Sequence, residues 1–156
     1  MIKVGGGSEV EVGEIKDRVT DALCATKAAI SEGIVSGGGT ALLYSSKKLD
    51  SLITPQLTEG EVAGIRIIQH AIKIPLIRIA ENAGHQGNLV AASLLDKNVA
   101  GNGFNAATGE YVNMKEAGII DPTKVVRTAL VDASSVASLM LTTECMIFDE
   151  PEKKSD

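Results

Sequence analysis

Apolar and polar positions follow a helical period over most of the chain. From Ile15 onward apolar side chains recur every three or four positions, which predicts a long helix that begins after Ser8 and ends near Gly33. Further helices are predicted over residues 40–52, from 58 to the break at Pro75, and over 76–83, 89–95 and 122–141. The last of these is apolar around much of its circumference, so we expect it to be a central buried helix.

Capping residues and glycines mark where these helices begin and end. Ser8 with Glu11, and Thr58 with Glu61, have the spacing of a capping box, in which two side chains satisfy backbone N–H groups at a helix start. The glycine run at residues 37–39 interrupts the helical pattern immediately before residue 40. The local pattern therefore predicts separate helices rather than one continuous rod.

Strand signals are few and short. Residues 2–4 and 145–148 predict one short strand near each end of the chain. The Gly- and Asn-rich stretch at residues 98–109 predicts a loop, with a small hairpin through Phe104 and Tyr111. The fold class expected from the pattern is mainly α, with short terminal β-strands.

Composition and charge exclude several classes of protein. Among the 156 residues 44% are hydrophobic and 22% charged, as in ordinary globular domains, and length alone favours one compact unit. No apolar run approaches the roughly 20 residues of a spanning helix, so we expect no membrane span. A net charge of −5 with 3% aromatic residues argues against nucleic-acid binding. The two cysteines lack the spacing of a disulfide framework or a metal site, which is typical of a reducing compartment.

The candidate chemistry rests on a few polar residues and on the glycine run at residues 37–39. Gly37 and Gly38 precede a helix. Either they form a flexible helix boundary, or their backbone, which carries no side chains, lies against a ligand. Their spacing matches neither a Walker loop nor a dinucleotide fingerprint. Asp121 before Pro122 predicts a helix N-cap, and the same carboxylate can accept ribose hydroxyls. Asp21 lies on the polar side of the first predicted helix, where a solvent-exposed carboxylate is the default interpretation. No metal site is predicted.

A further candidate is the segment at residues 105–107, which offers backbone groups and one amide to a base edge, or is simply loop composition. Taken alone, each of these segments is weak. Five of them stand in a particular order: 17–23 (Asp-Arg-Val-Thr-Asp-Ala-Leu), 33–39 (Gly-Ile-Val-Ser-Gly-Gly-Gly), 105–111 (Asn-Ala-Ala-Thr-Gly-Glu-Tyr), 118–125 (Gly-Ile-Ile-Asp-Pro-Thr-Lys-Val) and 142–145 (Thr-Thr-Glu-Cys). This set resembles the C-terminal part of a group I chaperonin, of the GroEL-like family, over residues 2 to about 151.

The resemblance implies a fold and a domain division. Residues 1–34 are expected to belong to the intermediate domain, an α/β domain, as a strand plus a long helix. Residues 35–156 are expected to form the C-terminal half of the equatorial ATP-binding domain, a multihelical bundle. The apical domain and the N-terminal equatorial half, with its phosphate loop, are expected to be absent from this chain.

The resemblance also implies residue roles in ATP binding, with Mg²⁺ as the accompanying ion in the full-length parent. The matched positions are Gly37 and Gly38 beside the nucleotide, Asn105, Ala106 and Ala107 around the adenine, Ile119 on the pocket wall, Asp121 on the ribose and Asp21 as the hydrolytic carboxylate. Without the phosphate loop, we expect this chain to bind ATP weakly and to hydrolyse it negligibly.

The implied parent is an ATP-dependent ring chaperonin that assists folding and refolding of other proteins. Its implied partners are other subunits in a heptameric ring, with co-chaperonin and unfolded clients bound through the apical domain. Residues 109–112 and 124–130 are similar to the mitochondrial type, which favours the mitochondrial matrix over the bacterial cytoplasm. The alternative is a non-enzymatic helical scaffold or oligomerisation domain, in which the glycines are helix breaks and Asp121 is only a cap.

Overall fold

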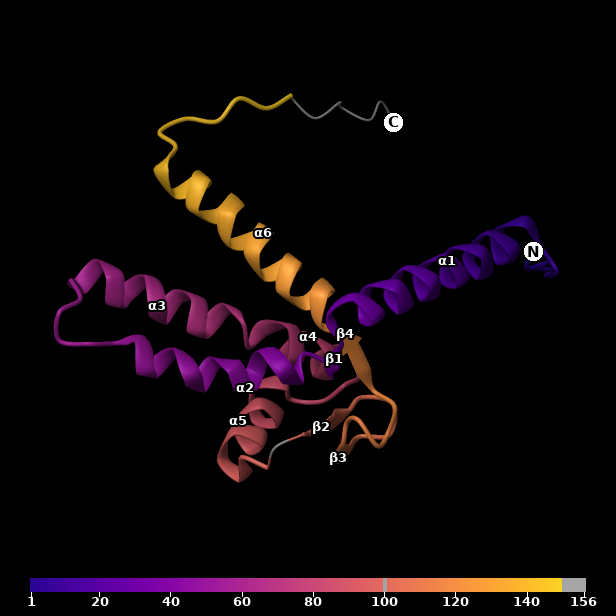
Figure 1. Cartoon of the computed structure of the whole chain (residues 1–156), viewed down its shortest axis with the longest axis horizontal. Coiled ribbons are helices and arrows are strands. Elements are labelled where there is room, and N and C mark those ends of the chain that lie inside the picture. Colours follow the sequence, from indigo (N-terminus) through magenta and orange to yellow (C-terminus); the bar gives the residue numbers. More distant parts are fainter. Residues whose placement is uncertain (100, 150–156) are drawn as a thin grey trace, which may run out of the picture.

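The computed structural model describes residues 1–99 and 101–149, and these residues form a mainly helical chain with two small sheets (Figure 1). The elements in order are α1 (Glu9–Glu32), β1 (Ile34–Ser36), α2 (Thr40–Lys48), the 3-10 helix η1 (Leu49–Leu52), α3 (Glu59–Ala71), α4 (Ile74–Asn82), α5 (Gly87–Lys97), β2 (Asn102–Asn105), β3 (Glu110–Asn113), β4 (Ile120–Pro122) and α6 (Thr123–Thr142). The helix positions predicted from periodicity are confirmed to within a few residues.

Both predicted N-caps form, but only one of them is the reciprocal capping box that the spacing indicated. At α3 the box is reciprocal: the Glu61 N–H donates to the Thr58 hydroxyl, and the Glu61 carboxylate accepts from the Thr58 N–H at 2.8 Å. At α1 the Glu11 N–H donates to the Ser8 hydroxyl at 3.2 Å, but the Glu11 carboxylate accepts from the N–H of Gly7. Both arrangements satisfy N–H groups that the first helical turn leaves without partners.

The core lies where α4 and α5 pack together beneath the start of α2. Leu43 of α2 and Leu76 of α4 are fully buried there, and Phe104 of β2 closes one side. The cluster consists of Leu43, Leu76, Ile77, Ala80, Val90, Ala91, Leu94 and Phe104. Each fully buried leucine contributes about 1.5–3 kcal/mol through the hydrophobic effect, so this small cluster holds α2, α4, α5 and the hairpin together.

One of the two sheets was predicted and the other was not. The hairpin β2–β3 is confirmed, with Phe104 opposite Tyr111 and the two rings in an edge-to-face contact of 5.6 Å. The second sheet pairs β1 with β4 in antiparallel register, placing Val35 opposite Asp121. Each of its strands has three residues. A strand that short carries no alternation to detect, and only the distant partner makes it a strand.

The predicted terminal strands are wrong within the described residues. Residues 2–4 and 145–148 adopt no strand, and no described segment pairs with either. Extended segments rich in apolar residues become strands only when another strand satisfies their backbone N–H and C=O groups. Residues 145–148 therefore present no strand edge to which another chain could pair.

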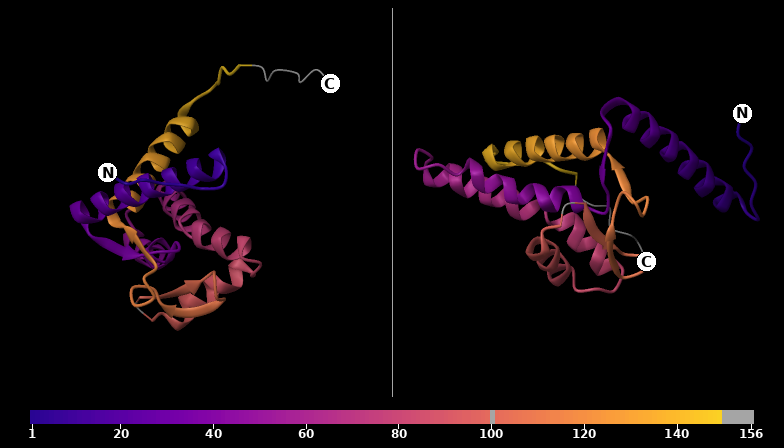
Figure 2. Two further views of the ribbon diagram at one scale, coloured as in Figure 1. Left: turned by 90° about the vertical axis from the view of Figure 1, so that its right-hand side faces the viewer. Right: turned by 60° about the horizontal axis from the view of Figure 1, so that its bottom comes forward.

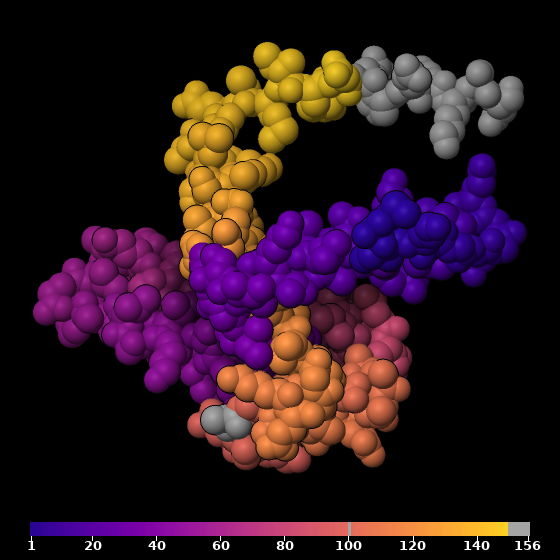
Figure 3. Space-filling view, turned by 45° about the vertical axis from the view of Figure 1, so that its right-hand side comes forward, coloured from indigo at the N-terminus to yellow at the C-terminus, as the bar shows by residue number. Residues whose placement is uncertain are grey.

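The prediction that the last helix is central and buried is also wrong. None of the residues of α6 is buried, and α6 and α1 both extend away from the core (Figures 1 and 3). Figure 1 shows α6 diverging from α2 and α3, although the right-hand view of Figure 2 projects the three helices nearly parallel, and α6 faces α2 and α3 across an open groove. Among the described residues, α6 is also the helix whose length and apolar composition suffice to cross a membrane, where none was expected. Because its apolar side lines the groove, the same composition fits a packing face.

Candidate functional site

The glycine run between β1 and α2 is packed against the rest of the chain. The Gly37 N–H donates to the Ile119 carbonyl at 3.0 Å, and a Cβ at Gly37 would lie 3.1 Å from the Ile120 nitrogen. Gly39 has a φ of +74°, and a Cβ there would lie 2.6 Å from the backbone nitrogen of Leu76. Gly39 admits no side chain unless the backbone shifts, and a side chain at Gly37 would be in unusually tight contact, so close packing within the protein accounts for these two glycines.

Gly38 differs from its neighbours because it faces the hairpin. Its φ is +63°, and the atoms nearest to a Cβ placed there are the Met114 methyl carbon at 3.1 Å and the Phe104 carbonyl oxygen at 3.9 Å. Phe104 immediately precedes Asn105, the last residue of β2. The fold therefore brings the glycine run beside the segment at residues 105–107, which is distant from it in sequence.

The turn that follows β2 is held by its own first residue. The Asn105 side-chain oxygen accepts from the Ala107 N–H at 3.0 Å, and the Asn105 carbonyl accepts from the Gly109 N–H at 2.8 Å. Ala106 packs against the core, whereas Ala107 is exposed. The side-chain oxygen of Asn105 is thus engaged in the turn, which leaves the amide NH₂ as the group suited to reading a base edge.

Asp121 lies in a strand and not at the helix N-cap. The N-cap of α6 is Pro122, and no side chain caps the helix, so the predicted capping role of Asp121 is wrong. Its backbone is extended because it pairs with Val35 across the β1–β4 sheet. The side chain is half-buried, and this burial raises the pKa of the Asp121 carboxyl above its ordinary value.

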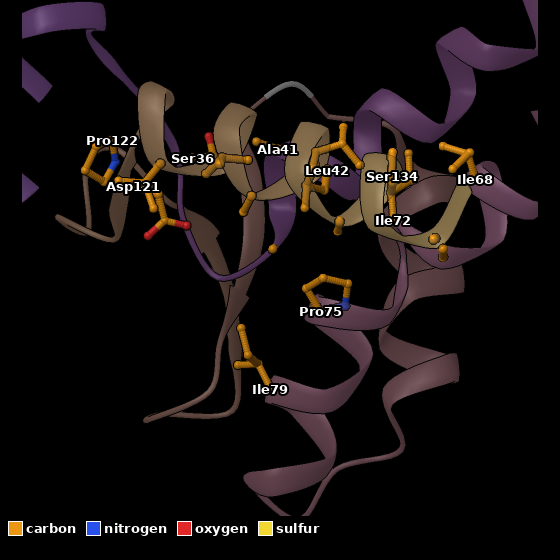
Figure 4. A pocket seen from close by; sticks show the side chains of 18 of the residues that line it. Ser36, Ala41, Leu42, Ile68, Ile72, Pro75, Ile79, Asp121, Pro122 and Ser134 are labelled. Atoms are coloured by element: carbon orange, nitrogen blue, oxygen red, sulfur yellow. The ribbon is translucent and has the colours of Figure 1, made fainter. Parts of the chain in front are cut away.

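The Asp121 carboxylate stands at one end of an open groove of about 620 Å³. Ser36, in the strand that pairs with β4, and Gly39 also line the groove, and the remaining wall is almost wholly apolar, from α2, α3, α4 and α6. Figure 4 shows Asp121 and Pro122 at one end of this groove and Ile68 with Ser134 at the other. The volume falls within the range of small-molecule sites, about 300–1,000 Å³. A carboxylate in this position is able to accept hydrogen bonds from ligand hydroxyls.

The structure brings together most, but not all, of the predicted site residues. Gly37 is hydrogen-bonded to Ile119, and Asp121 lies two residues after Ile119 in sequence. Gly38 lies next to the strand that ends at Asn105. Asp21 lies on the exposed middle of α1. It does not line the groove, and no side-chain hydrogen bond of Asp21 occurs among the described residues. Within residues 1–99 and 101–149 no group of three or more His, Cys, Asp and Glu side chains is arranged to hold a metal ion.

Sequence reasoning missed two buried residues beside this site. Met114 is fully buried between the glycine run and the hairpin. Thr40, the first residue of α2, is also fully buried, and its hydroxyl has no hydrogen-bond partner among the described residues. No motif marks either residue, because their neighbours come from other parts of the chain.

The comparisons with a family model and with curated proteins point to the same family. The family model described as "TCP-1/cpn60 chaperonin family" matches residues 1–151. The chain is 60% identical over 152 residues to the mitochondrial chaperonin CPN60 of Euglena gracilis, covering 97% of this chain and 27% of that protein. It is 56% identical over 156 residues to the mitochondrial chaperonin CPN60-1 of Cucurbita maxima, covering 100% of this chain and 27% of that protein.

A solved structure agrees in fold and in sequence. The crystal structure of a group III chaperonin in the open state superposes with a TM-score of 0.78 at 32% identity, covering 92% of this chain and 30% of that chain. In length, the chain spans about a quarter of the curated relatives that it matches.

Proposed function

The chain belongs to the TCP-1/cpn60 chaperonin family, and on that premise we propose that it is the C-terminal, adenosine-binding part of an ATP-driven protein-folding chaperonin. The observation that carries this proposal is the position of Asp121. Its half-buried carboxylate lies at the end of a groove that Ser36 and Gly39 also line. The Asp121 carboxylate does not cap a helix, and its charge is disfavoured by burial, so it does not stabilise a helical scaffold. A ribose supplies the hydroxyl donors that a partly buried carboxylate needs.

The proposed contacts divide between three segments that the fold makes neighbours. The first is the glycine run, the second the turn after β2, and the third the stretch from Ile119 to β4. The assigned roles are Gly37 and Gly38 beside the nucleotide, Asn105, Ala106 and Ala107 around the adenine, Ile119 on the pocket wall and Asp121 on the ribose hydroxyls. These groups bind the nucleoside, and phosphates with Mg²⁺ need ligands that we do not assign to this chain.

Asp21 is proposed as the carboxylate that orients the attacking water in the assembled parent. Its exposed place on α1, away from the groove, fits a group that arrives only when α1 moves. Phosphoryl transfer depends mainly on positioning and charge stabilisation, so hydrolysis would await that movement. The chain alone should therefore show negligible ATP turnover.

The domain division follows the same proposal. Residues 1–34 are assigned to the intermediate domain and residues 35–156 to the equatorial domain. Close to this boundary is Gly33, whose φ of +80° ends α1 and where an added Cβ would meet no atom within 4 Å. The proposed partners are other chaperonin subunits in a ring, and unfolded proteins and a co-chaperonin bound by the whole assembly. The proposed compartment is the mitochondrial matrix, and the named relatives are mitochondrial proteins.

Isothermal titration calorimetry with Mg-ATP tests the proposal directly. We expect weak binding by the natural chain and loss of binding in Asp121→Ala. Asp132→Ala removes an exposed carboxylate from α6 and serves as the matched control, with binding retained. If Asp121→Ala changes only the thermal stability, the scaffold alternative holds. Robust phosphate release by this chain alone would contradict the assigned division of labour.

A further inference from the structure

The Met114 side chain fills the space between the glycine run and the hairpin. Met114 directly follows β3 and is 0% exposed. A Cβ at Gly38 would lie 3.1 Å from its methyl carbon, and a Cβ at Gly103 would lie 2.5 Å from its Cγ and 2.6 Å from its sulfur. One unbranched thioether therefore touches both segments, and both contact points are glycines.

The backbone of Met114 joins the same parts through hydrogen bonds. Its N–H donates to the Gly101 carbonyl at 2.9 Å, just before β2, and its carbonyl accepts from the Ile119 N–H at 2.8 Å. The Ile119 carbonyl in turn accepts from the Gly37 N–H at 3.0 Å. Main chain and side chain thus link the hairpin, the Ile119 segment and the glycine run at one residue.

Thr40 reinforces the same junction from α2. Its fully buried hydroxyl lies against Gly103, where an added Cβ would collide with it. The space that a Cβ at Gly103 would need is therefore already occupied by Met114 and by the first residue of α2. The hairpin has little freedom to shift relative to the glycine run while both side chains are in place.

We propose that Met114 is a positioning residue that sets the distance between the glycine run at residues 37–39 and the turn at residues 105–107, and thereby the width of the adenosine site. This inference rests on the proposed function for its ligand, an adenine nucleotide. Methionine suits the role because an unbranched, polarisable side chain fills a narrow gap between two bare backbones. Truncation at this position leaves a cavity into which the two segments relax.

The test compares Met114→Ala with Met114→Leu, and uses Leu94→Ala as the control for a buried cavity. Leu94 belongs to the core cluster and is 2% exposed, so its truncation destabilises the fold without touching Gly38 or Gly103. ATP affinity is measured by calorimetry at temperatures where each variant is folded. We expect Met114→Ala to weaken binding about tenfold, the cost of one misplaced hydrogen-bonding group. Met114→Leu restores most of the affinity, and Leu94→Ala keeps it.

A second measurement needs no ligand. Amide hydrogen exchange at Gly37 reports whether the glycine run stays docked on Ile119, and we expect Met114→Ala to accelerate it more than Leu94→Ala does. Equal acceleration in both variants, or unchanged ATP affinity in Met114→Ala, overturns the positioning role. If the natural chain binds no ATP, the adenosine function fails, and the exchange comparison still decides whether Met114 positions the two segments.

Discussion

Glu32 and Arg127 form a two-pronged ion pair that joins the end of α1 to the beginning of α6. The Arg127 Nε donates to one Glu32 carboxylate oxygen at 3.0 Å, and an Nη donates to the other at 2.7 Å, across 95 positions of sequence. Just beyond it, the Thr123 N–H donates to the Gly33 carbonyl at 3.0 Å. These bonds fasten α1 to the rest of the chain where its own residues are not buried.

The first prediction concerns the pH range over which this pair acts. The hydrogen bond from Arg127, with the charges of Arg127 and Lys124, lowers the pKa of Glu32 below its ordinary value of 4.5. A lowered pKa gives stability that is present above the unfolded value and is lost as the pH falls through the folded value. We expect Glu32→Gln to lower the melting temperature at neutral pH and to match the natural chain in acid.

Thermal melts across pH and at two salt concentrations check this prediction. High salt should shrink the difference, because both partners are partly exposed and screened. Glu14→Gln is the matched control, because a Glu14 carboxylate oxygen lies 3.8 Å from an Arg18 guanidinium nitrogen and both side chains are largely exposed. A difference that persists unchanged at acidic pH would show that Glu32 acts through packing rather than charge.

The second prediction concerns Gly39. A methyl group there would collide with the Leu76 backbone, at a φ of +74° that L-residues rarely adopt. We expect Gly39→Ala to lower the free energy of unfolding by at least about 1–3 kcal/mol, the usual cost of such backbone strain. Gly64→Ala, in the open middle of α3, should instead raise it by about 0.5–1 kcal/mol through helix propensity. Urea denaturation measures both, and equal effects would contradict the packing described for the glycine run.

The third prediction follows from the half-buried carboxyl of Asp121. Burial raises its pKa above the ordinary value of 3.8, so ionisation in the folded state costs stability as the pH rises. Asp121→Asn, which keeps the shape without the charge, should therefore melt at a higher temperature than the natural chain at neutral pH. The difference should shrink as the pH falls and vanish below the ordinary carboxyl pKa of 3.8, where Asp121 is protonated in both the folded and the unfolded state. Melting curves over that range test the sign, with Asp132→Asn as control; a natural chain more stable than Asp121→Asn at neutral pH would refute it.

The fourth prediction concerns the apolar groove between α6 and the helices opposite it. Leu130 lines the groove, whereas Leu139 is 68% exposed and does not. An open apolar surface of this kind promotes association and binds hydrophobic dyes. We expect Leu130→Glu to reduce dye fluorescence and self-association more than Leu139→Glu does. Light scattering that finds the natural chain monomeric, with no dye signal, would show that the groove is closed in solution.

Local pattern was sufficient for the helix positions, for the N-caps at Ser8 and Thr58 and for the hairpin. The capping box of Thr58 and Glu61 joins residues three apart, and helical periodicity compares positions three or four apart, so both are visible in sequence. The ordered motifs identified the family, which the comparisons confirm. The same motifs nominated the site residues, whose roles stay predictions.

Tertiary structure decided what depends on contacts between distant segments. The pairing of Val35 with Asp121 turned an expected helix cap into a strand residue, because backbone hydrogen bonds to β1 hold it extended. The terminal segments lack such partners among the described residues and form no strands. Met114 between Gly38 and Gly103 was likewise invisible, since close packing is a property of the residues that meet in space. The sequence by itself determined which segments are helical and which family they belong to, and long-range pairing and packing determined how the candidate site is assembled.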